Sequence, residues 1–374
     1  MADRDDTTPT ATDEHAPHGS PGEARLASPD AELAPAVAPP RPVAVVSGGS
    51  AGIGRAVAEL LAERGHDVAV LARGEQRLKD TEAAIGARGV RGLGVVCDVS
   101  DLEQVRAARR LIVEKLGEPY VWVNSAMLTV LAPFVEIDDD EFRAVVDTTF
   151  MGQVNGTRVA LEGMRAAGEG RIVNIGSGLS YRPVPLQSAY CAAKAAINGF
   201  TSAVRSELIH DGFDRLSIGL VQLPAVNTPQ FDWSRHQGGR PPRPAAPVYQ
   251  PEVAARAVWK AIRERSREVI VGRSVLGLVF GDMVAPGALD RQLASMGYDG
   301  QTRDPEADAD LVRDRDNLFG PPPGRAGARG SFGDEAYEDG LIIDADRARA
   351  GVFGGGAIAL LAAGVALGAT LRRR

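Results

Sequence analysis

Six short apolar runs recur through the middle of the sequence, each separated from the next by a segment long enough for a helix. The runs are PVAVVS, HDVAVLAR, GLGVVCDVS, YVWVNSAM, GRIVNIGS and LSIGLVQLP. Runs rich in β-branched residues that alternate with helical patterns are typical of β-α-β units. Because helical crossovers cover both faces of a sheet, the pattern predicts an α/β fold with a doubly wound parallel β-sheet. Ser100 and Glu103 predict a capping box for the helix after the third run.

Three glycines follow the first apolar run, at Gly48, Gly52 and Gly54. In a doubly wound sheet the turn after the first strand faces the ligand crevice, and the next helix offers N–H groups to a pyrophosphate. Glycines let such a turn close tightly and let the backbone approach the phosphates. The GxxxGxG spacing therefore indicates dinucleotide binding, with a purely structural turn as the alternative.

Tyr190 and Lys194 lie four residues apart in the stretch SAYCAAK, which is otherwise built from small residues. Positions i and i+4 share one face of an α-helix, so the phenol and the amine act as a pair. An ammonium beside a phenol favours the phenolate and lowers the pKa of the tyrosine. The alternative is a chance pair on a solvated helix.

Together these motifs resemble the short-chain dehydrogenase/reductase family, in the branch with a single Rossmann-like domain, from about Pro42 to Thr228. SGGSAGIG resembles the TGxxxGIG cofactor turn, CDVS the acidic adenine motif, VNSAM the NNAG motif, YCAAK the YxxxK motif and LPAVNT the PG motif that leads to a Thr. Ser177, thirteen residues before Tyr190, stands where the family keeps its catalytic serine.

The resemblance implies a role for each matching residue. Tyr190 would be the general acid/base, Lys194 would supply positive charge and hold the nicotinamide ribose, and Ser177 would donate a hydrogen bond to the substrate oxygen. Thr149 completes the catalytic set, where most members carry an Asn. The implied cofactor-binding residues are Ser47, Gly48, Ser50, Gly52, Ile53, Gly54, Arg73, Asp98, Val99, Asn124, Ala126, Tyr190, Lys194, Val226 and Thr228.

Departures from the family pattern affect details of the site. A Thr at position 149 offers one short donor, so the water-mediated proton path to the lysine is expected to be rerouted or slower. Met127 replaces a glycine and Ser125 an asparagine beside the cofactor, and Ala225 replaces the glycine of the PG motif. None of these changes removes the Ser, Tyr or Lys.

Arg73 follows the second apolar run, at the position that distinguishes the two nicotinamide cofactors. An acidic residue there accepts hydrogen bonds from the ribose diol of NAD, whereas a basic one pairs with the 2′-phosphate of NADP. The sequence VLARGEQRL therefore favours NADP over NAD, unless Arg73 is only a solvated loop residue.

Apolar residues on two segments predict the substrate pocket. They are Leu179, Tyr181 and Leu186 before the tyrosine helix and Phe231 and Trp233 after the sixth run. A small apolar alcohol or carbonyl compound would fit such a pocket. The equally ordinary alternative is that these side chains pack against neighbouring loop residues.

Composition excludes several other classes of protein. The chain has 374 residues, a net charge of −7 and no basic stripe, so a nucleic-acid partner is not expected. Cys97 and Cys191 form no CxxC pair, which indicates neither a disulfide framework nor a metal site. Residues 1–40 are rich in Pro, Ala and acidic residues and predict a disordered leader without a secretory signal.

The rest of the chain divides into a predicted catalytic domain, 41–275, an extension, 276–350, that is partly irregular, and a final apolar run. Val352–Leu371 carries no charge, is long enough to span a bilayer as a helix and precedes three arginines. It predicts a C-terminal transmembrane helix, with a buried or amphipathic helix as the alternative. Because the cofactor pool is cytoplasmic, the catalytic domain is expected to face the cytoplasm although the arginines favour the opposite orientation.

Two classes of function follow. The first is a membrane-associated, NADP(H)-dependent oxidoreductase for an apolar alcohol or carbonyl, and the resemblance further implies a homo-oligomer. The alternative is a nucleotide-binding regulatory or scaffold protein that keeps the fold with little turnover. Intact Ser177, Tyr190 and Lys194 favour the enzyme, whereas Thr149 and Met127 favour the alternative.

Overall fold

The computed structural model describes residues 40–237, 240–303, 316–322 and 327–351. The described residues from Arg41 onward belong to one compact unit. The predicted leader, apart from Pro40, and the predicted anchor Val352–Leu371 lie outside the described residues. Within the described ranges, no helix combines the length and the apolar character needed to cross a bilayer.

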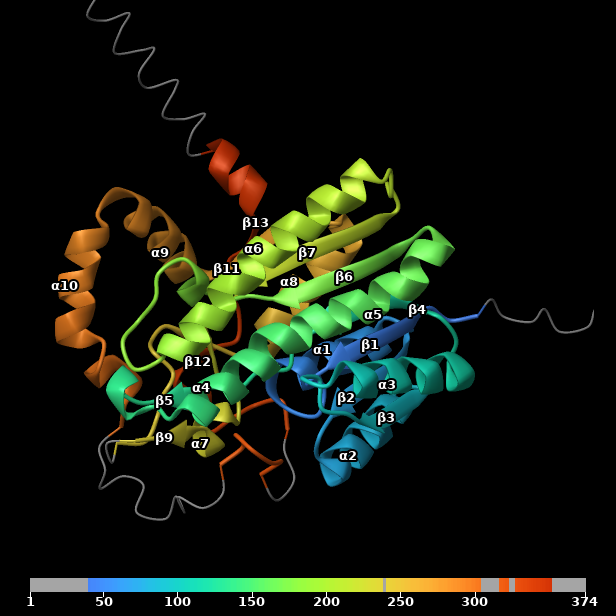
Figure 1. Cartoon of the computed structure of the whole chain (residues 1–374), viewed down its shortest axis with the longest axis horizontal. Helices are drawn as coiled ribbons and strands as arrows, with labels where there is room; N and C mark the ends of the chain where they lie inside the picture. The colour runs from blue at the N-terminus through green and yellow to red at the C-terminus, as the bar shows by residue number, and fades with distance from the viewer. Residues whose placement is uncertain (1–39, 238–239, 304–315, 323–326, 352–374) are drawn as a thin grey trace, which may run out of the picture. The chain divides into compact units, whose positions relative to one another are not determined.

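An eight-stranded sheet forms the centre of the fold, in the order β13-β11-β7-β6-β4-β1-β2-β3 (Figure 1). The strands are β1 (Val43–Ser47), β2 (Asp67–Ala72), β3 (Gly92–Val96), β4 (Pro119–Asn124), β6 (Gly170–Ile175), β7 (Leu216–Gln222), β11 (Glu268–Val271) and β13 (Ile342–Asp344). All neighbours pair in parallel except β13, which is antiparallel to β11. The predicted parallel sheet is therefore confirmed. Because the winding reverses between β1 and β4, a ligand crevice is expected at their carboxyl ends.

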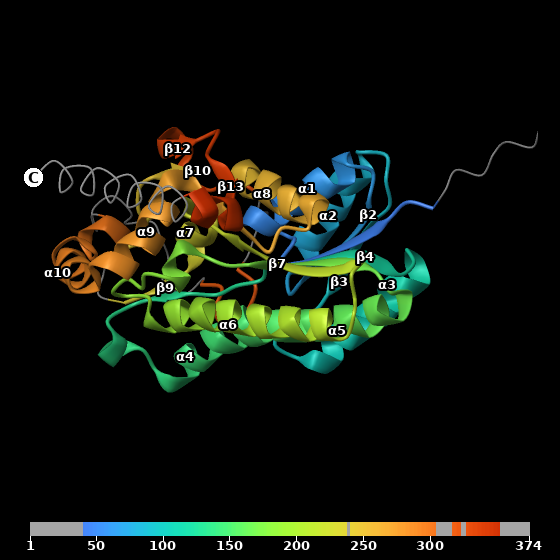
Figure 2. The same cartoon turned by 90° about the horizontal axis from the view of Figure 1, so that it is seen from above.

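Helices cover both faces of this sheet, as Figure 2 shows. One layer holds α1 (Gly52–Glu63), α2 (Glu75–Gly86) and α8 (Pro251–Glu264), and the other holds α3 (Leu102–Lys115), α5 (Gly152–Ala167) and α6 (Ser188–His210). Alternate residues of each strand point to opposite faces. In β1, Ala44 and Val46 therefore pack in the first layer, and Val43 and Val45 pack in the second.

Shorter elements frame the carboxyl ends of the strands. They are α4 (Asp139–Val146), α7 (Gln230–Trp233), α9 (Gly272–Val284), α10 (Pro286–Met296), the strand pair β5 (Val130–Leu131) and β9 (Arg235–His236), and a small sheet of β8 (Ala225–Val226), β10 (Val248–Tyr249) and β12 (Ala336–Tyr337). Strands β12 and β13 come from the C-terminal extension, so this segment pairs with strands of the preceding domain.

The predicted capping box at Ser100 is wrong by one residue. The N-cap of α3 is Asp101, whose carboxylate accepts from the N–H groups of Glu103 and Gln104. Ser100 instead donates to the carboxylate of Asp98. The aspartate is an equally strong N-cap and lies one residue closer to the helix.

Candidate active site

A cavity of about 560 Å³ lies at the carboxyl ends of the parallel strands. Most of the predicted site residues line it, although they come from segments far apart in the sequence. The predicted residues in its wall are Gly48, Ser50, Gly52, Ile53, Gly54, Arg73, Asp98, Val99, Ala126, Ser177, Leu179, Tyr190, Lys194, Val226, Thr228, Phe231 and Trp233. The fold thus brings the glycine turn, the serine and the Tyr–Lys pair to one place.

The turn between β1 and α1 has the geometry of a phosphate cradle. Gly48 has a φ of 68°, and a Cβ there would lie 2.7 Å from the backbone of Ala126. A Cβ on Gly54 would lie 2.3 Å from the carbonyl oxygen of Gly48. The N–H groups of Ile53 and Gly54, in the first turn of α1, have no partner among the described residues. The two N–H donors and the tightly packed glycine backbone, which a ligand can approach closely, fit the pyrophosphate of a dinucleotide.

Ser47 and Asn124, both predicted to bind the cofactor, do not line this cavity and lie beneath it. The hydroxyl oxygen of Ser47 accepts from the backbone N–H groups of Ser125 and Ala126 at 3.2 and 3.4 Å. The amide of Asn124 accepts from the Trp122 indole N–H at 2.9 Å and donates to Asn174 at 2.8 Å. Both side chains hold β1, β4 and β6 in register under the site rather than contacting it.

Tyr190 and Lys194 lie one turn apart on α6, and both face the cavity. The Lys194 side chain is 2% exposed, and its Nζ donates to the carbonyl oxygen of Ile175 at 2.7 Å. Burial lowers the pKa of Lys194 to about 7, because the interior disfavours the ammonium. Burial raises the pKa of the Tyr190 phenol, while a hydrogen bond with Ser177 acts in the opposite direction. The phenol is therefore the resting form at neutral pH.

Ser177 follows β6 and is the N-cap of a short 3₁₀ turn. Its hydroxyl oxygen accepts from the N–H of Leu179 at 3.1 Å, which fixes the side chain beside Tyr190. A hydroxyl carries one donor and two acceptor lone pairs, so Ser177 can accept this bond and still donate, to Tyr190 in this structure and to a substrate oxygen once one is bound. The arrangement can offer two O–H donors to a single substrate oxygen.

Thr149 was predicted as a catalytic residue, but it does not line the cavity. It lies fully buried in a π-helical turn, Asp147–Met151, that joins α4 to α5. Its hydroxyl accepts from the N–H of Leu128 at 2.9 Å and donates to the carbonyl of the same residue at 3.0 Å. Both bonds hold the loop after β4 against the π-helical turn, and a role of Thr149 in proton transfer stays a prediction.

Arg73 directly follows β2 and lines the end of the cavity beside Gly74 and Asp98. Burial lowers the pKa of its guanidinium, and Asp98 raises it. Arg77, four residues later on α2, lines the same end and was not singled out from the sequence. The only signal in the sequence was that two arginines follow closely after the second apolar run.

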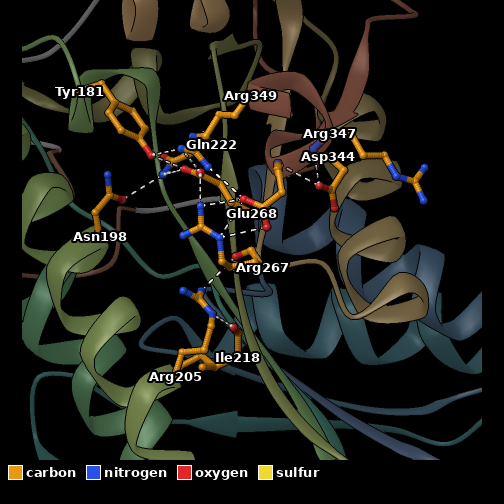
Figure 3. Close-up of polar contacts among 11 residues, drawn as sticks. Tyr181, Asn198, Arg205, Ile218, Gln222, Arg267, Glu268, Asp344, Arg347 and Arg349 are labelled. Carbon is orange, nitrogen blue, oxygen red and sulfur yellow. Dashed lines mark hydrogen bonds and ion pairs between the residues drawn. The ribbon is translucent and has the colours of Figure 1, made fainter. Parts of the chain in front are cut away.

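Tyr181 and Leu186 were predicted in the substrate pocket but do not line the cavity. The Tyr181 hydroxyl donates to the buried carboxylate of Glu268, as Figure 3 shows, and Arg349 contacts the same carboxylate. Glu268 is distant in sequence, so the local pattern gave no sign of this partner. Leu186 is buried with a φ of 66°, and its carbonyl accepts from the N–H of Ala132.

Trp233 lines the cavity, but at the arginine end. Its ring lies 4.4 Å from the guanidinium carbon of Arg77. Trp233 therefore contacts a residue of the arginine end, and its role toward a substrate stays a prediction. Leu179 and Phe231 remain as predicted residues of the cavity wall.

Comparison with known proteins agrees with this geometry. The sequence profile described as short chain dehydrogenase matches residues 42–237, about half of the chain. This protein belongs to the short-chain dehydrogenase/reductase family. It is accordingly an NAD(P)-dependent oxidoreductase.

Three relatives of this short-chain dehydrogenase illustrate the similarity. The 3-oxoacyl-[acyl-carrier-protein] reductase FabG of Pseudomonas aeruginosa is 39% identical over 169 residues, which cover 44% of this chain and 67% of the relative. A metagenomic short-chain oxidoreductase solved with NADP is 26% identical, with a TM-score of 0.50, covering 59% of this chain and 90% of that one. A short-chain dehydrogenase/reductase of Burkholderia phymatum, solved with NAD, has a TM-score of 0.59 and is 24% identical. The match covers 65% of this chain and 94% of that one, and it shows that the two proteins share the fold.

The short-chain dehydrogenase profile ends at residue 237, yet later residues complete the cavity. Leu278 on α9 and Leu293 and Met296 on α10 add apolar lining. The sequence of this part of the extension predicts no role in the site, because its helices contact the site only once the chain has folded back. Among the described residues, no cluster of His, Cys, Asp or Glu is arranged to hold a metal ion.

Proposed function

We propose that this short-chain dehydrogenase transfers a hydride between NADP(H) and a small apolar alcohol or carbonyl compound, with Tyr190 as the general acid/base. The proposal rests on one observation. Ser177, Tyr190 and Lys194 line the same cavity as the glycine turn and Arg73. Residues for proton transfer, substrate orientation and cofactor binding therefore line one cavity.

The nicotinamide supplies or accepts the hydride when it is bound. Tyr190 gives its phenolic proton to the substrate oxygen during reduction, and its phenolate removes that proton during oxidation. Ser177 donates a hydrogen bond to the same oxygen and stabilises its developing negative charge. Lys194 favours the phenolate whenever it carries a proton, and its pKa of about 7 leaves it partly charged at neutral pH. The resting phenol already carries the proton that reduction of a carbonyl requires.

Two further observations support NADP as the preferred cofactor. Arg73 and Arg77 lie at the end of the cavity that follows β2, and the residues directly after this strand are Arg73 and Gly74 rather than an acid. Guanidinium groups suit a phosphate, whereas the ribose diol of NAD needs an acceptor. The 26% identical metagenomic relative was solved with NADP.

The substrate class follows from the other end of the cavity. Leu179, Phe231, Leu278, Leu293 and Met296 give it an apolar wall, with Ser177 and Tyr190 as the polar groups that orient an oxygen. A pocket of this kind selects an apolar body with one carbonyl or hydroxyl group. The similarity to the 3-oxoacyl-[acyl-carrier-protein] reductase of Pseudomonas aeruginosa supports a carbonyl substrate.

A spectrophotometric assay tests the proposal. The full-length protein is incubated with NADPH and a panel of apolar ketones and aldehydes, and oxidation of the cofactor is followed at about 340 nm, with NADH in parallel. We expect turnover with NADPH to exceed that with NADH. Cofactor binding without turnover on any substrate would favour the nucleotide-binding scaffold instead.

Membrane association is a separate proposal, carried by the sequence of Val352–Leu371 alone. If this segment inserts into a bilayer, the full chain should sediment with membranes and resist alkaline extraction, whereas a chain ending at Ala350 should not. Recovery of the full chain in the supernatant without detergent would contradict the proposal. The homo-oligomer implied by the family is tested by light scattering on the same preparations.

A further inference from the structure

Two stretches of the C-terminal extension, 316–322 and 327–333, cross the cofactor end of the cavity, and we call them together the C-terminal strap. The first stretch runs between α7 and α2 (Figure 1). Neither stretch belongs to the part of the chain that matches the family profile, which ends at residue 237.

The strap is fixed to the domain by side chains. Leu318 is 1% exposed and packs among Leu128, Val130 and Val145. The carboxylate of Asp316 pairs with Arg235 at 2.8 Å. Such a buried apolar anchor and a partly buried ion pair hold the intervening backbone in one place.

The second stretch is fixed to the loop that follows β7. The N–H of Gly330 donates to the carbonyl of Asn227 at 3.2 Å, and the N–H of Phe332 donates to the side-chain oxygen of the same asparagine at 2.9 Å. The Phe332 ring meets Phe231 edge to face, with 6.0 Å between ring centres. The strap therefore holds the segment next to Thr228 as well.

Carbonyl groups of the strap contact the residues assigned to the cofactor phosphates. The two terminal nitrogens of Arg73 donate to the carbonyls of Asn317 and Leu318, the latter at 3.2 Å. Arg77 donates to the carbonyl of Pro322 at 2.6 Å. The N–H of Gly52 donates to the carbonyl of Gly327 at 3.1 Å. One segment thus reaches both the 2′-phosphate end and the pyrophosphate turn.

These contacts leave room for a ligand. Asn317, Pro321 and Pro322 line the cavity and do not fill it. A guanidinium has five N–H donors, and the strap uses two of those of Arg73. The N–H groups of Ile53 and Gly54 have no partner among the described residues. A segment that competed with the cofactor would be expected to occupy these donors and the space in front of them.

We propose that the strap is a specificity-determining wall of the cofactor site, which orients Arg73 toward the 2′-phosphate of the adenosine and retains the bound NADP(H). The inference rests on the proposed NADP(H) dependence. Two fixed carbonyl acceptors hold the planar guanidinium in one orientation, so less side-chain freedom is lost when a phosphate binds. An Arg73 guanidinium held in this way has no phosphate to pair with in NADH, which has a hydroxyl at that position.

A pair of matched double variants of the full-length chain tests the wall. D316A/L318A removes the ion pair and the apolar anchor of the strap. D339A/L341A removes the same residue types, equally spaced, from a more exposed part of the extension, where Asp339 pairs with Arg256. Dissociation constants for NADPH and NADH are measured for both by titration calorimetry, alone and in combination with Arg73→Ala.

We expect D316A/L318A to weaken NADPH binding by about 10-fold and NADH binding by less than about 3-fold, with D339A/L341A close to wild type. The selective loss should disappear when Arg73 is already Ala, because the strap would act through that residue. Tighter NADPH binding in D316A/L318A would identify the strap as a competitor and overturn the proposal. Unchanged or equally weakened binding of both cofactors would overturn it as well.

Hydrogen exchange on the wild-type chain provides a test that does not depend on the folding of a variant. NADPH should slow exchange at the amides of residues 317–320 more than NADH does at equal saturation. Protection confined to the glycine turn would overturn the inference and leave the proposed function intact. A wild-type protein that binds neither nucleotide would instead refute the proposed function, and the inference with it.

Discussion

The side-chain nitrogen of Lys194 lies 5.6 Å from the centre of the Tyr190 ring, one turn away on α6. The ammonium is therefore close enough to stabilise a phenolate, but the hydrogen bond of Lys194 goes to the carbonyl of Ile175 and not to the phenol. The phenol is instead hydrogen-bonded with Ser177, so the two hydroxyl groups lie together in the cavity wall, where a substrate oxygen would bind. This relationship assigns proton transfer to Tyr190 and electrostatic support to Lys194.

Replacing Tyr190 by Phe removes the only phenol that the described residues contribute to the cavity wall, and it keeps the ring. We expect turnover to fall by about 10²-fold or more, because the proton donor is lost, while NADPH binding stays within about 2-fold of wild type. Steady-state kinetics and fluorescence titration measure the two quantities. Near-normal turnover would show that another group transfers the proton.

Arg73→Ala tests the cofactor preference. We expect NADPH binding to weaken by about 1.5–3 kcal/mol, because a charge-assisted pair with the 2′-phosphate is lost, and NADH binding to change little. The loss should shrink at high salt. Equal weakening of both cofactors would mean that Arg73 only holds the strap through its bonds to Asn317 and Leu318.

Lys194 also makes the stability of the protein depend on pH. Its pKa is about 7 in the folded chain against 10.5 in the unfolded one, so the unfolded chain binds more protons between these values. The cost of burying the ammonium is complete below about pH 7 and declines as the pH rises toward 10.5. Relative to Lys194→Met, wild type should gain about 2–3 kcal/mol in the free energy of unfolding between about pH 7 and pH 9. Parallel pH profiles in urea denaturation would contradict the lowered pKa.

The central sheet was predictable from sequence because its strands are short β-branched runs whose pattern is local. The position of the site followed, since glycines after β1 and residues after β4, β6 and β7 must meet at one edge of a parallel sheet. Side-chain direction was not predictable to the same degree. Tyr181 turns toward Glu268 because a buried carboxylate needs donors, and that carboxylate lies 87 positions away.

The extension was the least predictable part, for the same reason. Strand β13 has only three residues, Ile342–Asp344, and forms because the edge of β11 is open to it. The strap has no periodic pattern at all, and its contacts are made largely by backbone carbonyls. Neither feature leaves a mark in composition or spacing that sequence analysis detects.

Arg349→Ala tests how the end of the described chain is held. Glu268 is 2% exposed, and its carboxylate is shared by Arg349, Tyr181 and Gln222 (Figure 3). Removing the arginine leaves the buried charge with weaker partners, so we expect a loss of about 1–3 kcal/mol in the free energy of unfolding. Arg347→Ala, at an exposed position two residues earlier, is the matched control and should change stability by less than about 0.5 kcal/mol. Similar urea midpoints for the two variants would show that the Glu268 network does not hold the C-terminal segment.

Gly54→Ala tests the phosphate cradle most directly, because the added methyl group would meet backbone rather than a movable side chain. A Cβ at this position would lie 2.3 Å from the carbonyl oxygen of Gly48 and 2.7 Å from its carbonyl carbon. The turn must open to relieve this contact, and the N–H groups of Ile53 and Gly54 would then move away from the pyrophosphate. We expect NADPH and NADH to lose affinity alike, by at least about 10-fold, since both share the pyrophosphate.

Gly86→Ala is the control. A Cβ at Gly86 has no neighbour within 4 Å among the described residues, and Gly86 ends α2, where Ala is the better helix former. That variant should bind both cofactors normally and be equally or slightly more stable. If Gly54→Ala also binds both cofactors normally, the glycine turn is structural and the cofactor lies elsewhere in the cavity.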